Sequence, residues 1–323
     1  MSALSVDKNP EKYDEYSFTL PEMYRKLAEE NLGETDEIRE HSLAQLRDWI
    51  AKHPFIKRCR TDAPFLLRFL RMRKFSVPRA QETLERYLAM RQSFPEWFQK
   101  LDPQDSEINE VLDDFQFRYL GQDSKGRAVV SLPIKVFNVD KFGSAHQSRD
   151  CQLFLESLAD NEQVQIGGYV VLVDYADITM RHIAIWSIVD VKNFINCVNH
   201  SLPLRLKEIH AVGLPKFAMT IAELAVSCMS QKLKDRIHCH KSMEDAKKHL
   251  EVKMLTTDYE GGTQDPKELK RAYLEQVRAK REELLLLDQM EIDAERYKSL
   301  WHLTTDDSIE SGVAGSFRKL NVD

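Results

Sequence analysis

The sequence predicts an α/β fold, a mostly parallel mixed sheet with flanking helices, preceded by an all-α N-terminal domain. Two observations support this. Over the first 100 residues, apolar side chains recur at spacings of three and four, which is typical of amphipathic helices. From about residue 115, apolar runs typical of strands alternate with helical segments. The order strand, helix, strand, helix, strand implies right-handed crossovers onto a mostly parallel sheet.

Amphipathic helices account for the N-terminal part. One starts after a cap at Thr35 or Asp36. A second starts at Pro64, whose fixed φ suits a first helical turn. A third covers residues 77–98, and the polar, proline-containing stretch 101–105 ends the domain. On the second helix, four basic residues are expected on the solvated face: Arg68, Arg71, Arg73 and Lys74.

Strand signals mark the second part of the chain. Alternation at 115–119 and a glycine-bounded turn at 121–126 predict a hairpin. The apolar run 169–173 is continuous, which predicts a strand covered on both faces. The remaining elements are expected to be a helix at 148–163, a helix at 184–199, a strand at 203–211 and an apolar helix at 214–230.

These elements divide the chain into five segments. They are an N-terminal tail (1–19), a helical domain of three or four helices (20–103), an α/β domain (104–264), a helical extension (265–302) and a tail (303–323). In the extension, Asp265 and Pro266 suit the start of a helix. Its apolar residues do not sustain heptads, so we expect it to pack on the core of a monomer.

Composition limits the classes of function. A net charge of -6 and a pI near 6.0 argue against nucleic-acid binding. The five cysteines are scattered and form no CxxC pair, so free thiols in a reducing compartment are expected. The sequence shows no signal peptide, membrane span or lipidation motif. A cytoplasmic protein is therefore expected.

Signatures of catalysis and of metal binding are weak. Asp174 and Asp177 follow an apolar strand, the usual place for a catalytic carboxylate in an α/β sheet. A turn that caps the next helix is the simpler interpretation. His238-Cys239-His240 offers three ligand types, but neighbouring residues on a strand point to opposite faces, which disfavours a metal site.

Residues 202–240 combine charge and apolarity in an unusual way. Arg205 and Lys207 alternate with leucines, so on a strand the bases share one face and the leucines the other. The apolar stretch 214–230 is too short to cross a bilayer, and basic residues return at Lys232 and Arg236. Each base near an anionic leaflet contributes roughly 1 kcal/mol, so the segment suits transient docking at a membrane.

Several motifs together resemble one family. FLLRFLRMRKFSVPRA followed by RYLAMR resembles the N-terminal helical unit of the CRAL-TRIO lipid-transfer family. GGYVVLVDY, LPLRLKEIH, KLKDRIHCH and the DYEGG box at 258–262 resemble its lipid-binding domain, in the same order. The resemblance covers roughly residues 60–263 and is nearest to the tocopherol-transfer and retinaldehyde-binding members. The closing GSFRKLNVD is similar to the tails of insect members.

The resemblance implies binding and transfer of one small hydrophobic ligand, such as a tocopherol, a retinoid, a carotenoid or a similar lipid, without catalysis, metal or cofactor. It implies a gate helix over the pocket at about 214–230, and docking at membranes that contain phosphatidylinositol bisphosphate. The aligned motifs place the phosphoinositide site at Arg73, Arg205, Lys207, Lys232 and Arg236. The apolar pattern places the pocket at Phe154, Leu158, Tyr169, Val171, Val173, Phe194, Leu204, Leu206, Phe217 and Ile221.

The expected gate departs from the family pattern. It has small side chains and lacks the Lys-Pro-Phe-Leu box of many relatives, which predicts a larger pocket. Two alternatives remain open. One is a phosphoinositide-recruited scaffold that carries no cargo, and the other is an α/β phosphate-handling enzyme that uses Asp174.

Overall fold

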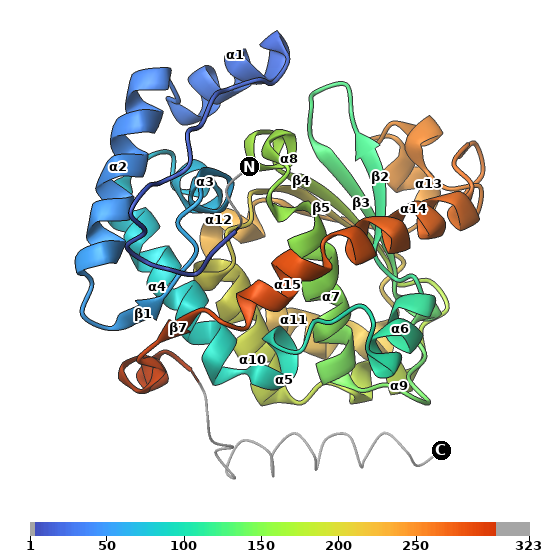
Figure 1. Cartoon of the computed structure of the whole chain (residues 1–323). Coiled ribbons are helices and arrows are strands. Elements are labelled where there is room, and N and C mark those ends of the chain that lie inside the picture. The colour runs from blue at the N-terminus through green and yellow to red at the C-terminus, as the bar shows by residue number, and fades with distance from the viewer. Residues whose placement is uncertain (1–3, 302–323) are drawn as a thin grey trace.

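The computed structural model describes residues 4–301 (Figure 1). The longer helices are α1 (Glu22–Leu32), α2 (Asp36–Lys52), α3 (Ala63–Met72), α4 (Val77–Ser93), α6 (Ser106–Asp113), α7 (Ser144–Ala159), α10 (Ile188–Asn196), α11 (Met219–Ser227) and α14 (Pro266–Ala279). Shorter helices are α5 (Pro95–Phe98), α8 (Glu162–Gly167), α9 (Met180–Ala184), α12 (Gln231–Lys234), α13 (Met243–Lys247) and α15 (Arg281–Leu287). The strands are β1 (Ile56–Arg58), β2 (Arg118–Gln122), β3 (Ala128–Pro133), β4 (Tyr169–Asp174), β5 (Leu206–Val212), β6 (Ile237–His240) and β7 (Glu291–Ile292).

Five strands form the central sheet in the order β2-β3-β4-β5-β6 (Figure 1). The β2–β3 hairpin is antiparallel, and the pairs β3–β4, β4–β5 and β5–β6 are parallel. The predicted mixed, mostly parallel sheet is therefore confirmed. Helix α7 lies over one face, and α13 packs near the other, where Leu172 and Val212 are buried. Both faces of β4 are covered, which explains its continuous apolar run.

Local chemistry moves some expected boundaries. The hairpin starts at Arg118, because buried Phe115 has a φ of 48°, which an extended strand does not allow. The helix expected at 148–163 is two helices, since the Asn161 side chain accepts the backbone N–H of Gln163 and caps α8.

Helix α2 begins at an expected cap, whereas α3 begins at Ala63 after a cap at Asp62, with Pro64 in its first turn, and the helix expected at 77–98 is divided into α4 and α5. The Thr35 hydroxyl accepts the backbone N–H of Ile38 at the start of α2. The expected solvated face of α3 is wrong at two of four positions, because the Arg68 and Arg71 side chains are buried in ion pairs. Because α3 is packed on several sides, it has no broad solvent-exposed face, and its buried charges are neutralised by carboxylates from other elements.

Both chain ends of the described part pack on the helices. The segment 4–19 has no regular secondary structure, and the Lys8 ammonium donates to the carbonyl oxygens of His53 and Ile56. Helix α14 packs on α7 and β2, and Leu284 and Leu287 of α15 are buried. The extension therefore packs on the core as expected. The predicted tail 303–323 lies outside the described residues.

Candidate functional site

A cavity of about 280 Å³ lies between the sheet and helices α7 and α10. It is lined by Gln116, Phe117, Val130, Leu132, Ile134, Gln147, Ser148, Cys151, Phe154, Leu155, Tyr169, Val171, Val173, Trp186, Phe194, Val198, Leu202, Leu204, Leu206 and Ile209. Its walls are largely apolar. No Asp, Glu, Lys or Arg side chain is among these residues, so the cavity suits an uncharged hydrophobic molecule.

Seven of the ten predicted pocket residues line this cavity. They are Phe154, Tyr169, Val171, Val173, Phe194, Leu204 and Leu206. Leu158 lines a separate cavity of about 260 Å³ under α14, because it lies one helical turn beyond Phe154 on the side of α7 that faces the extension. Phe217 and Ile221 line neither cavity. Contact of any of these residues with a ligand stays a prediction.

Helix α11 does not cover the cavity, unlike the gate helix that was expected over the pocket. None of its side chains is buried, and Met219 is 43% exposed. Phe217, in the 3-10 turn that precedes α11, is 38% exposed. The wall is supplied instead by Trp186, Phe194 and Val198, whose larger side chains occupy this side. Trp186 and Phe194 pack edge to face with ring centroids 5.3 Å apart.

Some lining residues were not predicted although a signal existed. On β3, Val130 and Leu132 pair with Val171 and Val173 of β4 and therefore share their face. Alternation along β3 could have identified both. The polar residues Gln116, Gln147 and Ser148 carry no comparable signal, because an amide or hydroxyl that faces a cavity cannot be told from a surface residue by its spacing.

All five predicted phosphoinositide-site residues line one recess of about 410 Å³. Arg73 lies at the end of α3, Arg205 and Lys207 at the start of β5, and Lys232 and Arg236 in and after α12. Lys74 and His200 also line this basic recess. The structure thus brings together residues that are up to 163 positions apart, counted from Arg73 to Arg236. That they bind a headgroup stays a prediction.

The charges of the basic recess have no acidic partners. Within residues 4–301, none of the five predicted bases forms an ion pair with a carboxylate. Burial and the neighbouring Arg236 charge lower the pKa of Arg205 to about 10, and burial and the charges of Arg205 and Arg236 lower the pKa of Lys207 to about 8. Burial also lowers the pKa of Lys232. The recess would therefore gain from a bound anion.

Hydrogen bonds to backbone oxygens hold two of these arginines in place. Arg205 donates to the carbonyl oxygen of Gln165 at 2.9 Å and to that of Ile166. Arg236 donates to the carbonyl oxygen of Leu206. The Arg236 guanidinium is thus tied to Leu206, which also lines the cavity, and the Arg205 guanidinium is tied to α8, which lies outside the cavity lining.

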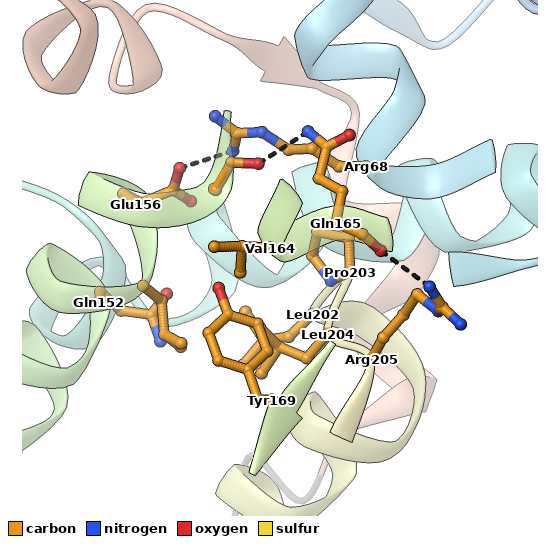
Figure 2. A pocket seen from close by; sticks show the side chains of 12 residues that line it. Arg68, Gln152, Glu156, Val164, Gln165, Tyr169, Leu202, Pro203, Leu204 and Arg205 are labelled. Carbon is orange, nitrogen blue, oxygen red and sulfur yellow. Dashed lines mark hydrogen bonds and ion pairs between the residues drawn. The ribbon is translucent and has the colours of Figure 1, made fainter. Parts of the chain in front are cut away.

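The cavity and the basic recess share a wall, namely Val198, Leu204 and Leu206. Figure 2 shows Leu202 and Leu204 beside the Tyr169 ring, with Arg205 on the other side reaching the Gln165 backbone. The expected strand at 203–211 starts only at Leu206, so Leu202, Leu204 and Arg205 lie in the segment just before β5, and Leu204 and Leu206 line both the cavity and the recess. We call the segment 202–206 the partition.

A third void of about 30 Å³ adjoins the partition (Figure 2). It is lined partly by Gln152, which is fully buried and whose side-chain nitrogen and oxygen both lack a protein partner. The void has room for about one water molecule.

Asp174 has the contacts of a turn residue. Its Oδ1 accepts the backbone N–H of Ala176 at 2.9 Å, and its Oδ2 accepts the Tyr259 hydroxyl at 2.9 Å. Asp177 pairs with Lys135 at 2.9 Å. Among the described residues, no three His, Cys, Asp or Glu side chains are grouped so that they could hold a metal ion.

Comparisons with known proteins agree with the motifs. Residues 113–261 match the family model of the CRAL/TRIO domain, and residues 35–108 match that of the Pinta-like UBA domain. The alpha-tocopherol transfer protein-like proteins of Mus musculus and Homo sapiens are each 30% identical over 251 residues, which cover 77% of this chain and 72% of theirs. Clavesin-1 of Pongo abelii is 27% identical over 248 residues, covering 76% and 70%. The crystal structure of Sfh5 aligns with a TM-score of 0.44 and 13% identity over 79% of this chain and 92% of that one.

None of the helices in residues 4–301 is both long enough and apolar enough to cross a bilayer. Identity and coverage over three quarters of the chain, together with the mixed sheet, agree with the motifs found in the sequence. The chain therefore belongs to the CRAL-TRIO family of lipid-binding and transfer proteins.

Proposed function

We propose that the protein carries one small hydrophobic molecule, such as a tocopherol, a retinoid, a carotenoid or a similar lipid, and exchanges it at membranes that contain phosphatidylinositol bisphosphate. It works in the cytoplasm as a monomer that docks transiently, and it does no covalent chemistry. One observation carries the proposal: an apolar cavity and a basic recess without ion-paired carboxylates share the residues of a single wall.

The cavity supports tight binding of a cargo. Burying roughly 400 Å² of apolar ligand at about 25 cal/mol per Å² gives at most about 10 kcal/mol, and immobilising the ligand reduces this. A molecule bound in this way dissociates slowly, so transfer at a membrane requires a change in the protein that lowers its affinity for the cargo.

The basic recess supports recognition of an anionic headgroup. Its five cations lie together without carboxylates, which is unfavourable in the free protein and favours a multiply charged phosphate. Arginine forks bind phosphate oxygens in pairs, and Arg205 and Arg236 both line the recess. A headgroup here neutralises charges that the protein itself leaves unpaired.

The partition supports coupling between headgroup and cargo. Arg205 donates to the carbonyl oxygens of Gln165 and Ile166 through Nη1 alone, so a phosphate that draws the guanidinium group toward itself weakens these two hydrogen bonds. When Arg205 turns toward the phosphate, Leu204 and Leu206 on either side move with the backbone and loosen the cavity wall. Headgroup binding therefore favours release of the cargo.

Helix α11 supports a second link to the membrane. Phe217, Met219 and Val226 are exposed apolar residues, which suits contact with lipid. Its C-terminal end is tied to the recess, because Asn199 donates to the carbonyl oxygen of Cys228 and accepts the backbone N–H of Ser230. Asn199 also lines the recess, so a headgroup bound there contacts a residue that holds the end of α11. In this proposal α11 is the gate, and in this structure it stands away from the cavity.

Neutralising Lys232 and Arg236 together tests the proposal. At roughly 1 kcal/mol per base, the double change to glutamine is expected to weaken binding to vesicles with phosphatidylinositol bisphosphate about thirtyfold and to slow transfer to them. Vesicle flotation and a transfer assay with labelled retinol and tocopherol measure both. Lys253→Gln with Lys267→Gln, which removes the same charge from exposed positions outside the recess, should leave both unchanged.

The outcomes separate the alternatives. Unchanged transfer after the Lys232 and Arg236 substitutions contradicts the proposed role of the recess. Vesicle binding without any molecule that organic solvent extracts from the purified protein, and without uptake of lipid, identifies a scaffold. Phosphate turnover that Asp174→Asn abolishes would identify an enzyme.

Docking is expected to depend on pH through Lys207. Its pKa is about 8 in the free protein, and a bound phosphate raises it, so binding takes up a proton above that pH. Affinity for the vesicles should fall by up to about tenfold between pH 7 and pH 9. Lys207→Arg stays charged over this range and should remove most of the decline. An equal decline in both proteins would assign it to other groups.

A further inference from the structure

A chain of hydrogen bonds at one side of the cavity ends in a free donor. The Trp186 Nε1–H donates to Gln147 Oε1 at 2.7 Å, and Gln147 Nε2 donates to Gln116 Oε1 at 3.0 Å. Tryptophan can only donate, so it fixes the orientation of the Gln147 amide, which in turn fixes that of Gln116. The Gln116 nitrogen is therefore the end of the chain, and it has no partner in the described protein.

A second unpaired group lies nearby on α7. The Ser148 hydroxyl follows Gln147 in sequence, is buried and has no hydrogen-bond partner. Gln116 is fully buried and Ser148 is 1% exposed, and both line the cavity. Leaving a buried polar group without a partner costs more free energy than a hydrogen bond contributes, so the occupant of the cavity should supply the missing partners.

The cavity offers nothing to an ionised ligand. Its titratable lining residues are Cys151 and Tyr169. Burial raises the pKa of Cys151 to about 12 and raises the pKa of Tyr169, so both are neutral at physiological pH. A carboxylate or phosphate would lose its hydration here without meeting a cation.

We infer that the cavity selects an uncharged lipid with one oxygen that accepts a hydrogen bond, such as an alcohol or an aldehyde, and that Gln116 and Ser148 determine this choice. The Gln116 amide donates to that oxygen. The Ser148 hydroxyl donates to a carbonyl oxygen or accepts from an alcohol, which is why both classes fit. The apolar remainder of the ligand lies against the sheet. This inference rests on the proposed cargo function and names the class of cargo.

Two series of ligands with matched skeletons test it. One is retinol, retinal and retinoic acid, and the other is geranylgeraniol, geranylgeranial, geranylgeranoic acid and the corresponding hydrocarbon. Quenching of tryptophan fluorescence at pH 7.5 measures their affinities. The alcohol and aldehyde should bind at least about tenfold more tightly than the acid, which is about 1.4 kcal/mol.

Variants locate the preference. Gln116→Leu should weaken binding of the alcohol and aldehyde about tenfold and leave the hydrocarbon unchanged or tighter. Ser148→Ala should also weaken binding of the alcohol and aldehyde and spare the hydrocarbon, with a smaller loss of affinity than Gln116→Leu. Cys151→Ala lines the same cavity without an unpaired polar atom and should leave the ratio of alcohol to hydrocarbon unchanged. Gln116→Leu also removes the acceptor of the Gln147 N–H, so a lower thermal stability of the empty protein is expected with either role, and the ratio of alcohol to hydrocarbon affinity decides between them.

The results distinguish failure of the inference from failure of the proposed function. If the wild type takes up no member of either series, the cargo function falls and the inference with it. If it binds the neutral members but binds the acids as tightly, the inference alone is overturned. The same holds if Gln116→Leu weakens alcohol and hydrocarbon alike.

Discussion

Replacing Arg71 by methionine is expected to lower the free energy of unfolding by about 3–5 kcal/mol. The Arg71 guanidinium is fully buried and forms two hydrogen bonds to the Glu34 carboxylate, at 2.7 and 2.9 Å. It also donates to Glu162 and Gln165 of α8 at 2.8 Å. Methionine fills much of the space but leaves the buried Glu34 carboxylate with only the Arg39 guanidinium, at 3.3 Å, so its charge is poorly compensated. Urea unfolding followed by circular dichroism measures the loss.

A matched surface pair provides the control. Arg25 and Asp36 are 3.4 Å apart with side chains 43% and 59% exposed, so Arg25→Met should cost less than about 1 kcal/mol. Adding Glu34→Gln to Arg71→Met removes the uncompensated charge and should recover part of the loss. Equal effects at Arg71 and Arg25 would contradict the importance of burial.

Replacing Val171 by tryptophan is expected to abolish cargo binding. Val171 faces the cavity from the middle of β4. A tryptophan side chain buries about 150–250 Å² and would occupy much of a cavity of about 280 Å³. Denying the ligand about 150 Å² of apolar contact costs about 4 kcal/mol, or roughly a thousandfold in Kd. Fluorescence titration with retinol and native mass spectrometry measure the loss.

The same variant separates cargo from docking. The basic recess does not include Val171, so vesicle flotation should equal that of the empty wild-type protein, and the variant should still unfold cooperatively. Val171→Ala, which enlarges the cavity, should still bind. Cargo binding that survives Val171→Trp would place the cargo elsewhere, and the cavity that includes Leu158 would be the next candidate.

The sequence predicted the sheet and the grouping of the bases because both follow from short-range rules. Alternation alone assigned Leu204 and Leu206 to one side and Arg205 and Lys207 to the other; in the structure only the leucines line the cavity, but they line the basic recess as well as the two bases do. Aligned motifs then added Arg73, whose position beside β5 depends on tertiary packing.

What the sequence could not predict depends on contacts between distant elements. Arg68 looked like a surface charge because its carboxylate partners, Glu156 and Asp160, lie 88 and 92 positions away. Phe217 looked like a pocket residue, but a short helix of small side chains can stand away from the cavity while Trp186 and Phe194 form the wall. Periodicity shows that a face is apolar without showing what covers it.

The shared wall of Val198, Leu204 and Leu206 has a consequence for the empty protein. Thermodynamic linkage requires that two ligands weaken each other by the same factor. If a bound headgroup lowers the affinity of the protein for cargo tenfold, bound cargo lowers its affinity for the headgroup tenfold. Loaded molecules then leave the membrane sooner than empty ones. Unloaded protein accumulates on phosphoinositide-rich membranes until fresh cargo displaces the headgroup, so the supply of cargo sets how much protein is free to travel.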